Sequence, residues 1–271
     1  MDKRTTPFSG RLAHVSLRGE VAAPLTEGEA AQIIVPVADL LESPAGPRAR
    51  QLLIGAAVLV IDRDQGHVFI RVERDGYCGW IAERSVGRGP EPTHWVVAPA
   101  THLYSEPLVQ APEKASLSLG SRLAVVGSWG AWVNTPHGFI PASHIRPLDQ
   151  VAPDPVSVAE SLLGTPYLWG GNSRNGLDCS GLVQIAFHAA GRECPADSDM
   201  QMVMGRGLAP NDTLKRGDLI FWKGHVAMVV NPDTLIHANG HTMSVCYEGI
   251  REAIHRISSG GHGLVQARQR Y

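Results

Sequence analysis

Cysteine is scarce in this chain: there are only four among 271 residues, and no two form a CxxC pair. Cys78, Cys179, Cys194 and Cys246 also lack the spacing of a zinc finger, which argues against a structural metal site and against a dithiol redox site. Each cysteine therefore has to be interpreted from its own surroundings.

Long hydrophobic runs are also missing. The longest, LLIGAAVLVI at 52–61, is too short to span a bilayer and predicts a buried strand. The N-terminal MDKRTTPFSG has charges but no apolar core of a secretory signal. We therefore expect a cytoplasmic protein with free thiols and no membrane association, or an exported protein if a signal has been removed.

Charge of one sign is missing as well. Lys and Arg total 24, Asp and Glu total 26, and the formal net charge is −2. A nucleic-acid binder normally carries a basic patch and a clear positive excess, so we expect no nucleic-acid partner. The length and the 44% hydrophobic content are typical of a globular protein with two or three domains.

Glycine and proline are plentiful, with 29 and 19 residues. In the first 150 residues they mark the turns of two segments that repeat each other imperfectly. Each copy has a proline turn, an LxxG run and a closing aromatic strand, and Gly55 corresponds to Gly120. The matching segments are DLLESP (39–44), QLLIGAAVLVI (51–61) and FIRVERDGYCGWI (69–81), against HLYSEP (102–107), SLSLGSRLAVV (116–126) and AWVNTPHGFIP (131–141). Short strands at this spacing predict two small antiparallel barrels.

Two proline-rich stretches, GRGPEPTH (87–94) and RPLDQVAPDPVS (146–157), are typical of linkers between modules. They predict three domains, at 1–88, 89–150 and 151–271. In the last one, helical patterns at 156–164 and before Gly191 precede short apolar runs that indicate consecutive strands. The predicted fold class is α+β, with two small all-β barrels followed by helices packed on an antiparallel sheet.

The helix predicted in GLDCSGLVQIAFHAAG (176–191) carries a cysteine at its N-terminal end. Asp178 is a suitable N-cap, because its carboxylate can accept N–H groups of the first turn. Cys179 would then lie where the helix dipole favours a thiolate, with its own N–H free for an oxyanion. The alternative is an inert cysteine in the core.

Two histidines stand on adjacent predicted strands in KGHVAMVVNPDTLIHANG (223–240). A three-residue turn, Asn231-Pro232-Asp233, would pair Val230 with Thr234 and place His225 and His237 on one face. A two- or four-residue loop would separate them unless a bulge intervened. One thiol and two imidazoles can supply a nucleophile, a base and an orienting group, while a Cys/His₂ metal site is the competing interpretation.

The ordered motifs DCSGLVQ, RGDLIFW, HVAMVV and LIHA, within residues 156–255, resemble the NlpC-type cysteine peptidases that cleave bacterial cell-wall peptides. The resemblance implies a papain-like α+β domain. It implies Cys179 as nucleophile, His225 as general base and His237 as the group that orients it. Tyr167, in TPYLWGG, matches a family tyrosine beside the cysteine that assists the oxyanion.

The first two modules resemble bacterial SH3-like domains, and DSDMQ at 197–201 narrows the resemblance to the γ-D-glutamyl-L-diamino acid endopeptidase group. This group releases L-Ala-γ-D-Glu from peptides with a free N-terminal L-alanine, which implies cell-wall peptide recycling. The resemblance implies Asp197 as the carboxylate for the substrate amine, with Tyr77 and Glu42 as the candidates from the first module; for both of these a purely structural role is the alternative.

Further substrate-binding residues are implied around the same site: Ser180, Ser198, Asp178 and Trp169. The chain departs from the family pattern at two positions, with Ala196 in place of an arginine and Ala56 in place of an acid after Gly55.

The implied activity is hydrolysis by a thiol peptidase, with no metal or organic cofactor, a murein peptide as substrate and a monomeric chain. The alternatives are an exported hydrolase of intact wall and a non-catalytic wall-binding protein. Residues 1–30 and 255–271 carry no functional motif, although 257–271 is compatible with a final strand and tail.

Overall fold

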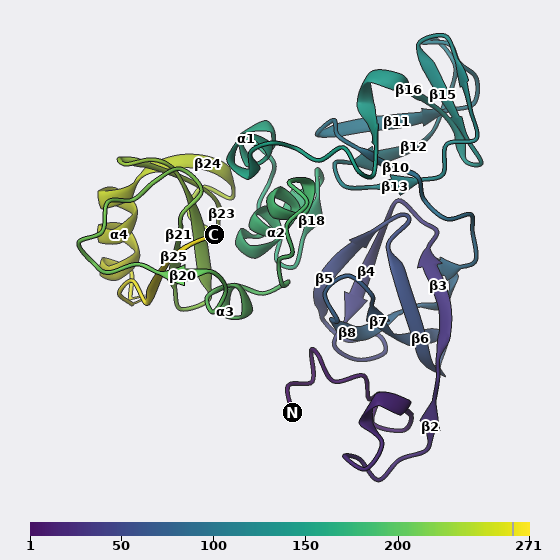
Figure 1. Ribbon diagram of the computed structural model, residues 1–271, viewed down its shortest axis with the longest axis horizontal. Coiled ribbons are helices and arrows are strands. Elements are labelled where there is room, and N and C mark those ends of the chain that lie inside the picture. Colours follow the sequence, from purple (N-terminus) through teal and green to yellow (C-terminus); the bar gives the residue numbers. More distant parts are fainter. Residues whose placement is uncertain (262) are drawn as a thin grey trace. The chain divides into compact units, whose positions relative to one another are not determined.

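The computed structural model describes residues 1–261 and 263–271. Its internal contacts divide the chain into two compact units, Met1–Gln150 and Val151–Tyr271 (Figure 1). Among the described residues, no helix has the length and apolar character needed to cross a membrane.

The first half of unit Met1–Gln150 is a seven-stranded antiparallel sheet in the order β5-β4-β8-β7-β6-β3-β9. Its strands are β3 (Glu29–Ile33), β4 (Val37–Leu41), β5 (Arg48–Leu53), β6 (Ala57–Asp64), β7 (His67–Val72), β8 (Cys78–Ala82) and β9 (Val86–Gly87). Before it come β1 (Ala13–His14), the 3₁₀ turn η1 (Val15–Leu17) and β2 (Leu25–Thr26); η2 (Glu83–Ser85) joins β8 to β9. Leu40, Ile70 and Ile81 of this sheet are fully buried.

The second half of this unit has a five-stranded sheet, β12-β11-β16-β15-β14, and a three-stranded sheet, β13-β10-β17. The elements are β10 (His94–Val96), β11 (Ala100–Tyr104), β12 (Glu113–Ser118), β13 (Arg122–Leu123), β14 (Gly127–Trp129), β15 (Trp132–Thr135), β16 (Gly138–Pro141), η3 (Ala142–His144) and β17 (Ile145–Pro147). The order strand, 3₁₀ turn, strand at β16-η3-β17 repeats that at β8-η2-β9, as the predicted duplication requires.

One strand expected from the sequence is broken. Residues 52–61 do not form a single strand, because β5 ends at Leu53 and β6 begins at Ala57. Gly55 lies between them with a φ of 78°, and its counterpart Gly120 has a φ of 91°. A Cβ at Gly55 would also collide with the carbonyl of Arg122. The LxxG run is therefore a corner that lets two stretches of chain approach closely.

The two halves share packing. Ile54 of the first half belongs to the core of the second, with Val96, Leu123 and Ile140. The Arg122 N–H donates to the Ile54 carbonyl at 2.9 Å. These contacts join the two halves into one compact unit. The domain boundary between residues 88 and 89 therefore stays a prediction from the sequence.

Unit Val151–Tyr271 is a six-stranded sheet with helices on both faces (Figure 1). The sheet order is β20-β25-β21-β22-β23-β24, and a small ladder, β18-β19, precedes α2. The strands are β18 (Asn172–Ser173), β19 (Gly176–Leu177), β20 (Arg206–Gly207), β21 (Leu219–Trp222), β22 (His225–Asn231), β23 (Thr234–Asn239), β24 (Ser244–Gly249) and β25 (Ala267–Arg270). The helices are α1 (Pro155–Ser161), α2 (Cys179–Ala189), α3 (Ser198–Gln201) and α4 (Ile250–Ser259).

Helix α2 packs on one face of this sheet and α4 on the other. Ten of the eleven residues of α2 are buried, so the helix is enclosed all round rather than amphipathic. It ends before Gly191, whose φ of 71° confirms the expected stop. The tail forms strand β25 against β21, as the sequence suggested.

Candidate active site

The start of α2 is built by Asp178. This residue is the N-cap, and its Oδ1 accepts the Gly181 N–H at 2.6 Å and the Ser180 hydroxyl at 3.1 Å. Its Oδ2 accepts the Gly170 N–H at 2.9 Å, which ties the glycine-rich loop TPYLWGGNSRNG (165–176) to the helix. Cys179 is consequently the first residue of the helix, as expected.

The surroundings of Cys179 differ from the expectation in one respect. The residue is only 7% exposed. Burial raises the pKa of its thiol to about 12, and the Asp178 charge acts in the same direction, while the N–H groups of Val226, Ser180 and Cys179 oppose it. The helix N-terminus was expected to lower this pKa, but desolvation is the larger effect. The thiol therefore needs a base to remove its proton.

The β22–β23 hairpin brings two histidines together. Its turn has two residues, since Asn231 pairs with Thr234, so the predicted pairing of Val230 with Thr234 is wrong. A bulge between Val229 and Asn231 then restores the pairing of Met228 with Ile236. The extra residue returns His237 to the face that carries His225, which is the exception that the alternation rule allows.

The two imidazoles are hydrogen-bonded. His225 Nε2 lies 3.0 Å from His237 Nδ1, and the rings are 5.1 Å apart. Cys179 Sγ contacts the Gly224 carbonyl at 4.0 Å, one residue before His225. His225 Nε2 faces His237, so Nδ1 is the nitrogen on the other side of the imidazole.

Beyond His237 lies a carboxylate that the sequence analysis did not identify. Glu248 Oε2 is 3.1 Å from His237 Nε2, at an angle that departs from an ideal hydrogen bond. Arg256 of α4 donates to Glu248 through Nε at 2.8 Å and Nη2 at 2.7 Å. These hydrogen bonds hold the pKa of Glu248 below its usual value. We call the set His225, His237, Glu248 and Arg256 the polar chain.

His237 is 1% exposed, and burial lowers its pKa to about 4, with Glu248 opposing and Arg256 assisting this shift. It is therefore neutral near pH 7, with one ring nitrogen as donor and one as acceptor.

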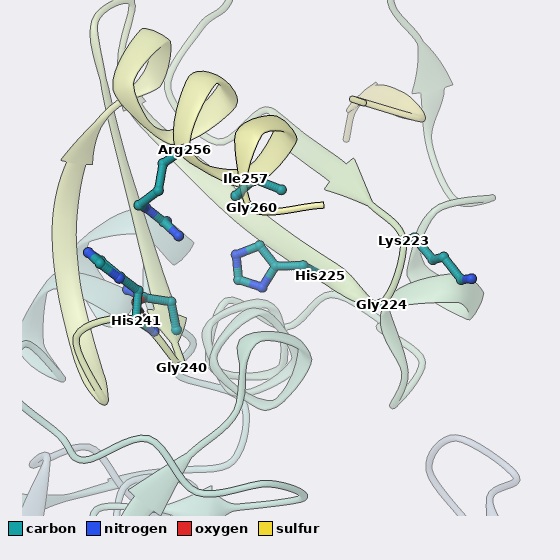
Figure 2. A pocket seen from close by; sticks show the side chains of 9 residues that line it. Lys223, Gly224, His225, Gly240, His241, Arg256, Ile257 and Gly260 are labelled. Atoms are coloured by element: carbon teal, nitrogen blue, oxygen red, sulfur yellow. Dashed lines mark hydrogen bonds between the residues drawn. The ribbon is translucent and has the colours of Figure 1, made fainter. Parts of the chain in front are cut away.

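A pocket of about 470 Å³ lies beside the polar chain. Figure 2 shows His225 and Arg256 lining it together with His241 of the β23–β24 turn. The two ends of the polar chain, His225 and Arg256, thus line a pocket beside α4.

Tyr167 lies close enough to the thiol to respond to it electrostatically. Burial raises the pKa of its hydroxyl, and the charges of Cys179 and Asp178 raise it further. The hydroxyl therefore remains a donor at neutral pH. Its role at an oxyanion stays a prediction.

The segment around Asp197 borders the same region. Asp197 precedes Ser198 at the start of α3, and its charge contributes to the raised pKa of Asp178. The buried Gln201 side chain donates to the carbonyls of Ser180 at 3.0 Å and Pro195 at 2.9 Å. This contact, which the sequence analysis passed over, fixes the Asp197 segment to α2.

Three other residues that were expected to bind substrate are Asp178, Ser180 and Trp169, and their surroundings differ from one another. Both carboxylate oxygens of Asp178 accept hydrogen bonds from within unit Val151–Tyr271, so its demonstrated contacts are structural. Ser180 is buried and donates to Asp178. Trp169 is 68% exposed on the glycine-rich loop. A substrate role for each of them stays a prediction.

The two candidates from the first module belong to unit Met1–Gln150. Tyr77 is 4% exposed, with the Arg50 guanidinium 5.3 Å from its ring centre, and Arg50 forms a buried ion pair with Asp75. Glu42 is exposed in the turn after β4. The contacts of Tyr77 are those of a structural aromatic, and its substrate role stays a prediction.

Among the described residues, no group of three or more His, Cys, Asp or Glu side chains is arranged to hold a metal ion. The arrangement that is present, a thiol at a helix start beside a hydrogen-bonded imidazole, is that of a nucleophile with its base.

Comparison with known proteins agrees with this chemistry. Residues 164–258 match the NlpC/P60 family, and residues 40–86 match the bacterial dipeptidyl-peptidase SH3 domain. The chain is 30% identical over 215 residues to the γ-D-glutamyl-L-lysine dipeptidyl-peptidase of Bacillus subtilis (strain 168), covering 69% of this chain and 71% of that protein. It is 27% identical over 221 residues to the protein of the same name from Bacillus cereus, covering 69% and 66%.

The fold has a solved counterpart. The crystal structure of a NlpC/P60 family protein from Bacillus cereus ATCC 10987 aligns with a TM-score of 0.76 and 22% identity, over 90% of this chain and 99% of that one. Fold and site together define a cysteine peptidase with N-terminal SH3-like sheets. The chain belongs to the NlpC/P60 family.

Proposed function

We propose that this peptidase hydrolyses the bond between γ-D-glutamate and the diamino acid of murein peptides that begin with a free L-alanine, releasing L-Ala-γ-D-Glu. The observation that carries the proposal is the relationship over 69% of the chain to proteins named γ-D-glutamyl-L-lysine dipeptidyl-peptidase. The thiol and the polar chain supply the chemistry that such a hydrolysis needs.

In the proposed reaction, Cys179 Sγ attacks the γ-carbonyl carbon while His225 Nδ1 takes the thiol proton. The carbonyl oxygen becomes an oxyanion, for which the Cys179 N–H and the Tyr167 hydroxyl are the donors. The C–N bond then breaks, His225 protonates the departing amine, and a thioester remains on Cys179. Water activated by His225 hydrolyses this thioester and restores the thiol.

In this proposal, Asp197 selects substrates with a free amino terminus. A carboxylate held beside the catalytic helix can pair with a substrate ammonium, and this pairing is strongest where water is excluded. The Gln201 contacts support this assignment, because they restrict the position of the segment that carries Asp197.

Peptides with a free L-alanine arise only after the glycan has been removed. We therefore propose a recycling role within the cytoplasm rather than hydrolysis of intact wall. Fractionation of producing cells, with antibodies against the chain, tests the compartment: recovery with the wall or the medium would contradict it.

The reaction is tested with two substrates, L-Ala-γ-D-Glu-L-Lys and its N-acetylated form, against wild type and Cys179→Ala. Release of L-Ala-γ-D-Glu only by wild type, and much faster from the free-amine peptide than from the N-acetylated one, is the expected result. Equal cleavage of both peptides would remove the amine selection and favour a hydrolase of intact wall. Cleavage of neither by folded protein would favour a wall-binding function.

A further inference from the structure

The polar chain determines where the protons of the two histidines lie. Glu248 is paired with Arg256 and ionised, so its oxygens can only accept. His237 Nε2, which faces this carboxylate at 3.1 Å, must therefore carry the ring proton. Its Nδ1 is then the acceptor, and His225 Nε2 must be the donor across the 3.0 Å contact.

This arrangement of protons determines whether His225 can act as a base for Cys179. If His225 is protonated on Nε2, its Nδ1 carries no hydrogen and is the nitrogen that can receive the Cys179 proton. If the protons of the chain were reversed, His225 Nδ1 would carry a hydrogen and could not act as a base. Because His237 is 1% exposed, the groups that face its two ring nitrogens, rather than bulk water, determine its tautomer.

We propose that Glu248 is a positioning residue for the peptidase reaction: through His237 it holds His225 in the tautomer whose Nδ1 accepts the thiol proton, and Arg256 keeps Glu248 an acceptor. The catalytic roles of Cys179 and His225 in this statement rest on the proposed function. Glu248 itself touches neither the substrate nor the thiol in the reaction.

Replacement of Glu248 by glutamine distinguishes this role from a structural one. Arg256 can only donate, so the amide oxygen turns toward it and the amide NH₂ faces His237. His237 Nε2 then becomes an acceptor, and the protons of both histidines move to Nδ1. We expect Glu248→Gln to lower kcat about 10²- to 10³-fold, with KM little changed.

Glu248→Ala is the informative comparison. It removes more of the side chain, but Arg256, the hydrogen-bond partner of Glu248, lines the pocket of about 470 Å³. We therefore expect water from this pocket to fill the vacated place and to accept from His237 Nε2. The native tautomer remains available, and we expect kcat to fall only about tenfold. The less conservative change is thus expected to be the milder one. Glu193→Gln, on the exposed loop after α2, is the matched surface control.

The tautomers are read directly from ¹⁵N NMR of labelled histidine rings in the Cys179→Ala protein, which does not depend on turnover. We expect His225 protonated at Nε2 with Glu248 or its alanine variant, and at Nδ1 with the glutamine variant. Unchanged tautomers in Glu248→Gln, or an alanine variant at least as impaired as the glutamine variant, would overturn the proposal. If wild type cleaves no murein peptide, the proposed substrate fails, and the NMR result alone decides the role of Glu248.

Discussion

At the scale of single residues, the burial of Cys179 sets the first prediction. Its thiol has a pKa of about 12 from its surroundings, so reactivity at neutral pH must come from proton transfer to His225. We expect His225→Ala to slow alkylation of Cys179 by iodoacetamide at pH 7 at least about a hundredfold. The rate in the variant should keep rising with pH up to the highest value at which it stays folded.

The measurement follows the Cys179 peptide by mass spectrometry, since three other cysteines are present. Cys78, whose pKa burial also raises to about 12, serves as an internal control that should not respond to His225→Ala. Equal alkylation rates of Cys179 in wild type and variant would show that the imidazole does not activate the thiol.

Asp197 carries the second residue-scale prediction. If its carboxylate pairs with the substrate ammonium, Asp197→Asn removes one charge and keeps the shape. We expect kcat/KM for L-Ala-γ-D-Glu-L-Lys to fall about 10- to 100-fold, while the slow cleavage of the N-acetylated peptide is unchanged or improved. An equal loss on both peptides would instead mean that the change disturbs α3. Asp199→Asn, exposed on the same helix, is the control.

At the scale of elements, the β22–β23 hairpin shows what the sequence can and cannot provide. Alternation along two strands was sufficient to propose that His225 and His237 share a face. It could not choose between a three-residue turn and the two-residue turn with a bulge at Val230, because both give the same parity. Glu248 was missed for a related reason: its approach to His237 depends on the register of β23 with β24, and the turn signal Asn239-Gly240 does not determine the length of the loop that sets this register.

The junction between the glycine-rich loop and α2 leads to a third prediction. A Cβ at Gly181 would lie 2.5 Å from the Gly171 carbonyl oxygen and 3.0 Å from Asp178 Oδ1. Gly181→Ala should therefore push the loop off the helix start, and we expect a loss of roughly 1–3 kcal/mol in the free energy of unfolding together with most of the activity.

Urea unfolding and peptide hydrolysis measure the two effects. Gly127→Ala is the matched control, because a Cβ there meets no atom within 4 Å and its φ is not positive. Wild-type stability in Gly181→Ala would contradict the close packing of loop and helix.

At the scale of the whole molecule, composition and repeats were sufficient to predict the fold class and the order of modules, since turn residues and strand spacing recur in both copies. They could not predict which of two opposing effects, the helix N-terminus or desolvation, determines the pKa of the Cys179 thiol. The helix start is a local feature of sequence, whereas the burial that raises the pKa of Cys179 depends on the strands packed over it. Desolvation of this kind becomes visible only when distant segments are assembled.

The same desolvation makes the stability of the molecule depend on pH. His237 has a pKa of about 4 in the folded protein and 6.5 as an unperturbed residue. Between these values the unfolded chain binds the additional proton, so the free energy of unfolding falls as the pH falls from 6.5 toward 4. The difference corresponds to roughly 3 kcal/mol for this residue at the bottom of the window. Glu248, whose pKa is lowered, acts mainly below 4.5 and leaves the upper part of the window to His237.

His237→Asn removes the titrating group and keeps a polar side chain in the hairpin. We expect the variant to be less stable than wild type at pH 7 but to lose less further stability on acidification, because no proton uptake at this position opposes folding. Urea unfolding at pH 7, 6, 5 and 4.5, followed by circular dichroism, gives the slope for each protein. Since all other titrating groups are common to both, the difference between the slopes belongs to His237 and its immediate partners. Parallel slopes would mean that His237 is not held neutral, and the polar chain would then lose the neutral acceptor on which the tautomer of His225 depends.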